Sequence, residues 1–250
     1  MTTEDFVPAS LRRLWGMSES SRLGRPATLD VGRVVAAAVE IADRDGLGGV
    51  TLPKVARSLG FTGMSLYRYV GSKDELLMLM ADAALDAPPE ADTDDWREGL
   101  RGWAFAQRAV LRRRPWLTRV PVSGPPSGPH QIAWMEAALA ILARTRLDWA
   151  HKVGILSLIS GYVVQSVRQD GELAEGRAEG RGQADAERDY GRALARLVEP
   201  ERFPEAALLF SSALFEAPPS DTPDAAITDA DFSLGLELIL DGVAVRVGQA

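Results

Sequence analysis

Four basic side chains lie in a stretch of the chain that has no acidic residue. Lys54, Arg57, Arg68 and Lys73 supply the charge between residues 46 and 73. Such side chains bind phosphate groups, and phosphate contacts contribute a large share of protein affinity for nucleic acid. The whole chain has a formal net charge of −7, so this basic segment is a local feature of an acidic protein. It is the first candidate binding site.

Residues suited to catalysis or metal binding are scarce. The chain has no cysteine, which excludes disulfides, thiolate metal sites and cysteine nucleophiles. Its two histidines, His130 and His151, are far apart and lack a supporting cysteine or carboxylate pattern. We therefore expect no catalytic residue, no metal and no cofactor, and a protein that is not an enzyme.

Helices on both sides position the basic segment. Asp30 is a good N-cap, and apolar residues recur at helical spacing over Val31–Asp45. Thr51 is the expected N-cap of a second helix, which tolerates Pro53 in its first turn and ends at Gly60. The turn is therefore short, and another helix follows it closely.

That next helix is predicted from near Gly63 to Val70, and a further one begins after it. Ser72 and Glu75 have the S-x-x-E spacing of a capping box, in which each side chain bonds the backbone of the other residue. The apolar run behind them predicts a helix that continues to about Asp86.

The helix from Gly63 has an inner and an outer face. Leu66 points inward, and Ala56 is small enough to let two helices cross closely. The outer face fits the major groove of DNA, which admits one helix. There Met64 suits a thymine methyl group, and Ser65 and Arg68 suit base edges or phosphate. The whole face consists of Thr62, Gly63, Met64, Ser65, Tyr67, Arg68 and Tyr69.

The same pattern also has a purely structural interpretation, an ordinary pair of short amphipathic helices in a helical protein. The lack of acidic residues over the whole stretch favours DNA binding. Lys73 would then lie near a phosphate, together with the free N–H groups that start the next helix.

The rest of the chain shows no strand periodicity, so we predict an all-α fold. A three-helix helix-turn-helix domain is expected over residues 29–87, and a larger helical ligand-binding and dimerisation domain over 88–250. Residues 1–28 are expected to form a flexible basic arm, and 171–187 a flexible loop. Further helices are predicted at 96–113, 131–144, 149–170, 188–198, 204–215 and 231–247.

Three strings between Leu29 and Asp86 resemble the DNA-binding domain of TetR-type regulators. They are A-A-x-x-I-A-D-x-x-G-L from Ala37, V-A-x-x-L-G-F from Val55, and M-S-L-Y-R-Y-V-x-S-K-D-E-L-L from Met64. The resemblance implies a homodimer on a near-palindromic operator, with one helix-turn-helix in each of two successive major grooves. It assigns DNA contacts to Thr51, Pro53, Thr62, Gly63, Met64, Ser65, Tyr67, Arg68, Tyr69 and Lys73.

The arm is similar to the basic extensions of some members of this family. Arg22 and Arg25 would enter the minor groove beside the recognition helix. The alternative is a solvated tail without a role in binding.

The C-terminal part resembles the regulatory domain of the tetracycline repressor type, through F-S-L-G-L-E-L-I-L-D-G from Phe232. The resemblance implies regulation by a small molecule bound in this domain. It also implies a dimer interface of four helices, two from each protomer, near 149–170 and 231–247. Both segments are apolar on more than one face, which a second copy would cover.

Five of the six tryptophans lie in this half, and aromatic walls with a few polar groups suit a largely apolar ligand of drug size. Ordinary core packing is the alternative. No set of histidines matches a metal-chelated ligand. The ligand-binding residues that we predict are Trp103, Gln107, Trp134, Tyr162 and Gln165.

These features predict a DNA-binding transcription regulator in the cytoplasm, a repressor released by a small, largely apolar effector. No membrane is expected, because no segment has the roughly 18 apolar residues that cross a bilayer. One alternative is an all-α small-molecule binding protein or enzyme with a vestigial helix-turn-helix. Another is a regulator that responds to a protein.

Overall fold

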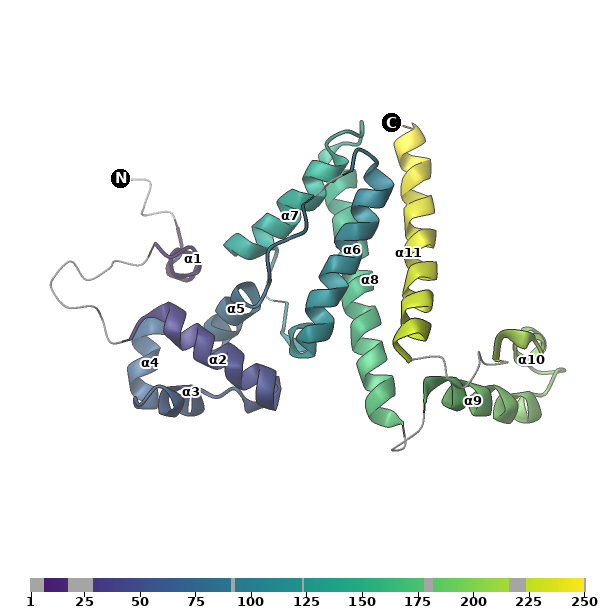
Figure 1. Cartoon of the computed structure of the whole chain (residues 1–250), viewed down its shortest axis with the longest axis horizontal. Coiled ribbons are helices and arrows are strands. Elements are labelled where there is room, and N and C mark those ends of the chain that lie inside the picture. Colours follow the sequence, from purple (N-terminus) through teal and green to yellow (C-terminus); the bar gives the residue numbers. More distant parts are fainter. Residues whose placement is uncertain are drawn as a thin grey trace. The chain divides into compact units, whose positions relative to one another are not determined.

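The computed structural model describes residues 7–17, 29–90, 93–122, 124–177, 182–215 and 224–249 (Figure 1). Within these ranges the chain is helical and has no strand, which confirms the all-α prediction. It divides into two compact units, one formed by residues 1–167 with 244–250 and one by 168–243. No helix in the described ranges is both long and apolar enough to span a bilayer.

The first unit contains the basic segment. Asp30, Thr51 and Ser72 each cap a helix by accepting a hydrogen bond from the backbone N–H three residues later. The predicted bounds of the helix after Asp30 are confirmed, whereas the helix after Ser72 ends before the predicted Asp86. The helices here are α1 (Ala9–Leu14), α2 (Val31–Asp45), η2 (Leu47–Gly49), α3 (Leu52–Ser58), α4 (Gly63–Val70) and α5 (Lys73–Ala83).

A tight turn and a buried hydrophobic contact hold α3 against α4. Gly60 has a φ of 78°, a backbone conformation that glycine adopts without a steric penalty. Ala56, Leu66 and Val70 are completely buried in one hydrophobic core that also includes residues of α2 and α5. The packing predicted for the helix-turn-helix is thus present.

The first unit continues with longer helices. They are α6 (Trp96–Arg113), the short η3 (Pro115–Arg119), α7 (Pro129–Leu142) and the first part of α8 (Trp149–Gly176). The bounds predicted for α6 are confirmed.

A buried carboxylate joins α5 to the start of α7. Asp82 of α5 accepts the backbone N–H of Gln131 at 2.9 Å, and its Oδ2 lies 2.9 Å from Nδ1 of His130. Gly128, which precedes α7, has no side chain to cap the helix, and a Cβ there would overlap the Asp82 carboxylate. Asp82 therefore takes the place of the missing cap.

Two indole groups make further links within this unit. Trp116 donates its N–H to the carboxylate of Asp43 on α2 at 2.6 Å. Trp134 of α7 donates to the backbone carbonyl of Asp86, just after α5, at 2.7 Å. The helices around the basic segment are thus bonded to those that follow.

The second unit has its own small aromatic cluster. The rings of Phe210 and Phe215 stack with centroids 5.3 Å apart, and Tyr190 lies edge-on to Phe210 at 5.7 Å. This unit contains the end of α8, α9 (Gln183–Leu197), α10 (Pro204–Phe210), η4 (Ala213–Phe215) and most of α11 (Asp224–Gln249).

The predicted loop at 171–187 is largely wrong. Helix α8 continues to Gly176, and α9 already begins at Gln183. An ion pair one turn apart, Arg168 to Glu172 at 2.8 Å, supports the extension despite the glycines.

The predicted flexible arm is also wrong in part, because it contains α1. Leu14 of α1 is buried in the core of the basic segment, which gives this short helix a reason to form. Arg22 and Arg25 lie outside the described residues.

Two glycines of α6 should respond differently to alanine. A Cβ at Gly99 would lie 2.8 Å from Cγ2 of Ile141 on α7, whereas nothing lies within 4 Å of a Cβ at Gly102. We expect Gly99→Ala to lower the free energy of unfolding by about 1–3 kcal/mol through overpacking. Gly102→Ala should raise it by about 0.5–1 kcal/mol, because alanine favours a helix. Urea unfolding measures both, and equal shifts would contradict the close approach of α6 and α7.

Candidate functional site

Helix α4 presents the side chains that the sequence places on its outer face. Met64 is 79% exposed and Tyr67 50% exposed, while Leu66 between them is completely buried. A Cβ at Gly63 would lie 3.7 Å from Cα of Pro53, so α3 begins close beside the start of α4. The two helices form one continuous surface at this end.

The start of α4 carries a pair of hydroxyl groups. Thr62 is the residue before the helix, and its Oγ1 lies 2.9 Å from Oγ of Ser65. The Thr62 side chain makes no capping hydrogen bond to the helix backbone. Because hydroxyl groups both donate and accept, this pair can exchange its mutual bond for one to a base edge or a phosphate.

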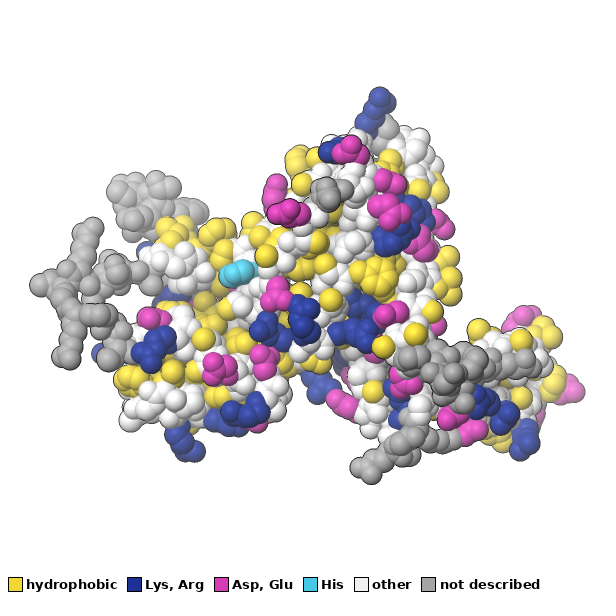
Figure 2. All heavy atoms as spheres, in the orientation of Figure 1, with side chains coloured by type: hydrophobic (Ala, Val, Ile, Leu, Met, Phe, Trp, Pro, Cys, Tyr) yellow, Lys and Arg dark blue, Asp and Glu magenta, His cyan; other side chains and the backbone are white. Residues whose placement is uncertain are grey.

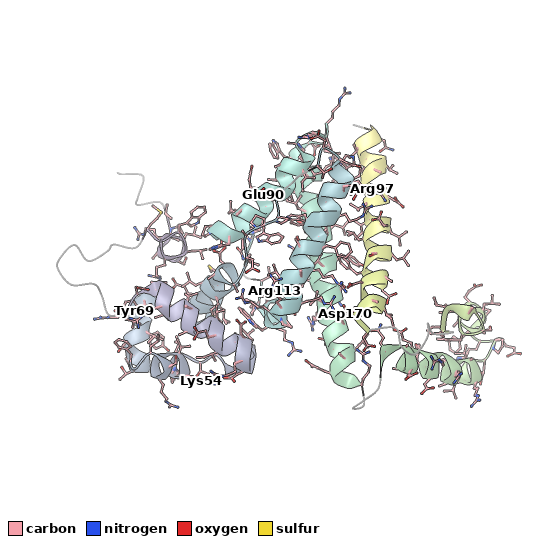
Figure 3. The ribbon with its side chains drawn as sticks, viewed as in Figure 1. Lys54, Tyr69, Glu90, Arg97, Arg113 and Asp170 are labelled. Atoms are coloured by element: carbon pink, nitrogen blue, oxygen red, sulfur yellow. The ribbon has the colours of Figure 1, made fainter. Side chains whose placement is uncertain are left out.

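Tyr69 is less exposed than its neighbours Tyr67 and Arg68. Its ring packs against the core in a half-buried position, and the guanidinium of Arg68 lies 6.0 Å from the ring centroid. Figure 3 shows Tyr69 beside α4 and Lys54 on α3. The ring of Tyr69 therefore supports Arg68, and only part of it is available for a DNA contact.

Ion pairs neutralise part of the basic segment. Lys54 Nζ lies 2.7 Å from the carboxylate of Asp45, at the end of α2. Hydrogen bonds from Arg44 and Lys54 hold the pKa of Asp45 well below its ordinary value, so this carboxylate stays charged. Figure 2 shows basic and acidic side chains interspersed on the visible surface of these helices. Among the described residues, Lys73 has no carboxylate partner.

The predicted DNA-contacting residues lie on or beside α3, α4 and the start of α5 in the first unit. Thr51 and Pro53 lie at the start of α3, and the Thr51 hydroxyl is the N-cap, which accepts the N–H of Lys54 at 3.3 Å. Thr62 precedes α4; Gly63, Met64, Ser65, Tyr67, Arg68 and Tyr69 belong to it; and Lys73 is the first residue of α5.

A cavity of about 400 Å³ lies in the same unit, between α6, α7 and α8. Trp103 and Trp134 form one wall, with ring centroids 6.2 Å apart, and the Trp103 indole donates to the carbonyl of Trp134 at 3.0 Å. The lining includes no Asp, Glu, Lys or Arg among the described residues. The cavity therefore suits an uncharged, largely apolar molecule.

One polar group in this lining lacks a partner. The carbonyl oxygen of the Gln107 side chain is buried and accepts no hydrogen bond, while its amide nitrogen lies 3.4 Å from Oγ of Ser160. A buried acceptor without a donor lowers stability by about 1–3 kcal/mol. A bound molecule with a hydroxyl or N–H group can satisfy it.

Three of the five predicted ligand-binding residues line the cavity, namely Trp103, Gln107 and Trp134. Tyr162 and Gln165 belong to α8 but are not among its described lining residues, so the structure does not place them there. The lining positions of α8 are Val153, Leu156, Ser157, Ser160 and Val164, which follow helical spacing. That spacing was the available signal in the sequence for the side of α8 that faces this cavity.

Each histidine pairs with one carboxylate. His130 Nδ1 lies near Asp82, and His151 Nδ1 lies 2.7 Å from Asp148 one turn earlier in the sequence. The described residues contain no cluster of three or more side chains suited to hold a metal ion.

A short helix pair with an exposed second helix, followed by a helical body with a cavity, defines a helix-turn-helix regulator of transcription. The description "bacterial regulatory proteins, tetR family" matches residues 34–79, and "tetracyclin repressor-like, C-terminal domain" matches residues 88–247. The chain belongs to the TetR family of DNA-binding transcription regulators.

Curated and solved relatives agree. The repressor DrrR1 of Streptomyces coeruleorubidus is 37% identical over 97% of this chain and 87% of its own length. The class A tetracycline repressor from transposon 1721, in Escherichia coli, is 30% identical over 85% of this chain and 89% of its own. ActR of Streptomyces coelicolor, solved with (S)-DNPA, has a TM-score of 0.69 and 26% identity over 88% of this chain and 100% of its own. A second ActR structure holds actinorhodin, with 25% identity over 88% of this chain and 98% of its own and a TM-score of 0.69.

The ion pair at Asp45 predicts unequal roles for two lysines. Each phosphate contact adds about 0.9 to the magnitude of the slope of log affinity against log salt. Lys73→Met should therefore lower that magnitude by about one. Lys54→Met should lower it by less than about half of that, because Asp45 already neutralises Lys54. Fluorescence anisotropy with duplex DNA over a series of KCl concentrations measures both. Equal losses would show that Lys54 leaves Asp45 when DNA binds.

Proposed function

We propose that this protein is a dimeric repressor that a small, largely apolar effector releases from a near-palindromic operator. It acts in the cytoplasm, where its DNA is. Residues 29–87 form the DNA-binding domain and residues 88–250 the regulatory and dimerisation domain. The cavity lined by Trp103, Gln107 and Trp134 is the effector site. The cavity carries this proposal, since it is uncharged and contains an unpaired acceptor in the same unit as α4.

The DNA contacts follow from exposure. Met64 and Tyr67 project from α4 toward bases and backbone, and Ser65 and Arg68 supply polar groups. Lys73 and the first N–H groups of α5 meet phosphate. Thr51, Pro53, Thr62, Gly63 and Tyr69 form the edges of this surface.

Relatives support ligand control. ActR has been solved with two small molecules, (S)-DNPA and actinorhodin. DrrR1 is itself a repressor. A ligand releases DNA only by binding the DNA-incompetent arrangement more tightly than the competent one.

The dimer interface is formed by α8 and α11. In α8, Trp149, Val153 and Leu158 are at least half exposed, and in α11 Leu234 and Leu238 are about two-thirds exposed. Such a number of exposed apolar side chains on long helices is typical of a surface that a second copy covers.

The first test is operator binding. Footprinting of DNA upstream of the protein's own gene should show a protected near-palindrome with half-sites about 34–36 Å apart, one helical turn. Replacing Tyr67 and Arg68 together with alanine should weaken binding more than about tenfold, because each base contact contributes about 1–3 kcal/mol. Uncharged, largely apolar compounds are then added to the complex. Protection that survives the double substitution, or a complex that no such compound dissociates, would contradict the proposal.

The unpaired oxygen of Gln107 gives a second test with two readouts of opposite sign. Gln107→Met keeps the volume but removes the buried acceptor, so the free protein should become more stable by about 1 kcal/mol. The same change should weaken a releasing compound that donates a hydrogen bond by about tenfold or more. Thermal unfolding and titration of the DNA complex measure the two effects. A variant that loses stability but keeps compound affinity would show that this oxygen does not face the effector.

The dimer gives a third prediction. Leu238→Asp should convert the dimer to monomer, because it places a charge in an apolar interface. Val122→Asp is the control, since Val122 is 94% exposed and lies on neither helix. Sedimentation equilibrium measures the mass of each, and a Leu238→Asp variant that stays dimeric would place the interface elsewhere.

A further inference from the structure

Helix α1 is bonded to the start of α5, beside the turn between α4 and α5. Arg13 donates to both carboxylate oxygens of Glu75, with its Nη2 at 2.8 Å from Oε2, and these side chains are only 25% and 11% exposed. This ion pair lies against Gly71, where the chain turns with a φ of 60° directly after α4. Leu14 anchors the same helix in the core.

The Arg13–Glu75 ion pair changes the predicted capping box. Ser72 accepts the N–H of Glu75 at 3.1 Å, as the motif requires. The Glu75 side chain is instead held by Arg13, so the second half of the box is replaced by a bond to α1. The N-terminal extension thus completes the start of α5, immediately behind the DNA-reading helix.

Trp15, the residue that directly follows α1, contacts the loop at the mouth of the cavity. Trp15 donates its indole N–H to the backbone carbonyl of Ser127 at 2.8 Å. The N–H of Ser127 in turn bonds Oε1 of Gln131 at 3.0 Å. Gly124, Pro126 and Gln131 all line the cavity, so this bond is made to a loop that a bound molecule touches.

The two contacts differ in how easily they open. The Arg13–Glu75 pair is mostly buried, whereas Trp15 is 48% exposed and its bond to Ser127 is open to solvent. An anchor that only filled a gap in the core would not need a hydrogen bond to this loop. An exposed hydrogen bond is readily exchanged for water.

We propose that the C-terminal end of α1 bridges the loop at the cavity mouth and the α4–α5 turn, through Trp15 and Arg13, and so positions the DNA-reading helix. A molecule that displaces the loop of residues 124–127 breaks the Trp15–Ser127 bond and loosens the hold of Arg13 on Glu75. This role rests on the proposed function only in taking an effector as the molecule that displaces the loop. The coupling itself consists of the bonds that Arg13 and Trp15 make.

Hydrogen exchange of the full-length free protein tests the coupling. Trp15→Phe keeps an aromatic ring but removes the N–H donor, and it should raise exchange at residues 71–77, around the Arg13–Glu75 contact, by about fivefold, the factor for one net hydrogen bond. Arg13→Gln should raise exchange at residues 127–131 by a similar factor. Arg12→Gln is the matched control, because Arg12 lies on the same helix as Arg13 and has no carboxylate partner among the described residues.

The proposal would be overturned if Trp15→Phe changed exchange only near Ser127 and Arg13→Gln only near Glu75. Equal changes in the Arg12→Gln control would also overturn it. Trp15→Phe is conservative, so its result stands even if Arg13→Gln unfolds the domain. Operator binding and compound release are measured separately. A failure of the proposed coupling through α1 is therefore distinguishable from a failure of the proposed repressor function.

Discussion

The carboxylate of Asp82 meets two requirements with one contact. A buried charge needs hydrogen-bond donors, and the first turn of a helix needs acceptors for its free N–H groups. Asp82 on α5 and the start of α7 satisfy each other, and Gly128 leaves the space for the carboxylate. Separating them would leave a buried charge and an unpaired N–H, so α5 and α7 are expected to shift together. We expect a displacement of α7 at the cavity wall to move α5, the helix that follows the DNA-reading pair.

Local signals in the sequence predicted the elements around the basic segment well. Asp30, Thr51 and Ser72 cap the helices as expected, and Gly60 turns the chain, because each acts within about four residues. Contacts between distant residues were not predictable in this way. Glu75 bonds Arg13 instead of its own helix, and α1 forms because Leu14 finds a core built by later residues. The phase of α8 relative to the cavity likewise depends on α6 and α7, and Tyr162 and Gln165 are not among the described lining residues.

The distribution of charge has a consequence for how DNA is selected. With Lys54 held by Asp45 and Arg13 by Glu75, fewer cations remain for sequence-independent phosphate binding than the composition indicates. An acidic chain with a partly neutralised contact surface should bind random DNA weakly. Discrimination then depends more heavily on the groups of α4 that meet base edges.

At the proposed effector site, the unpaired oxygen of Gln107 would also determine which molecules the protein can tell apart. An apolar wall such as Trp103 and Trp134 distinguishes ligands that differ by one methylene only weakly, by about 10-fold to 200-fold. A buried acceptor that is already dehydrated distinguishes a hydroxyl from a methyl group far more strongly, since the methyl leaves it unsatisfied. The regulator would therefore respond to the oxidation level of a compound more than to its size, and could separate a finished hydroxylated product from its deoxygenated precursor.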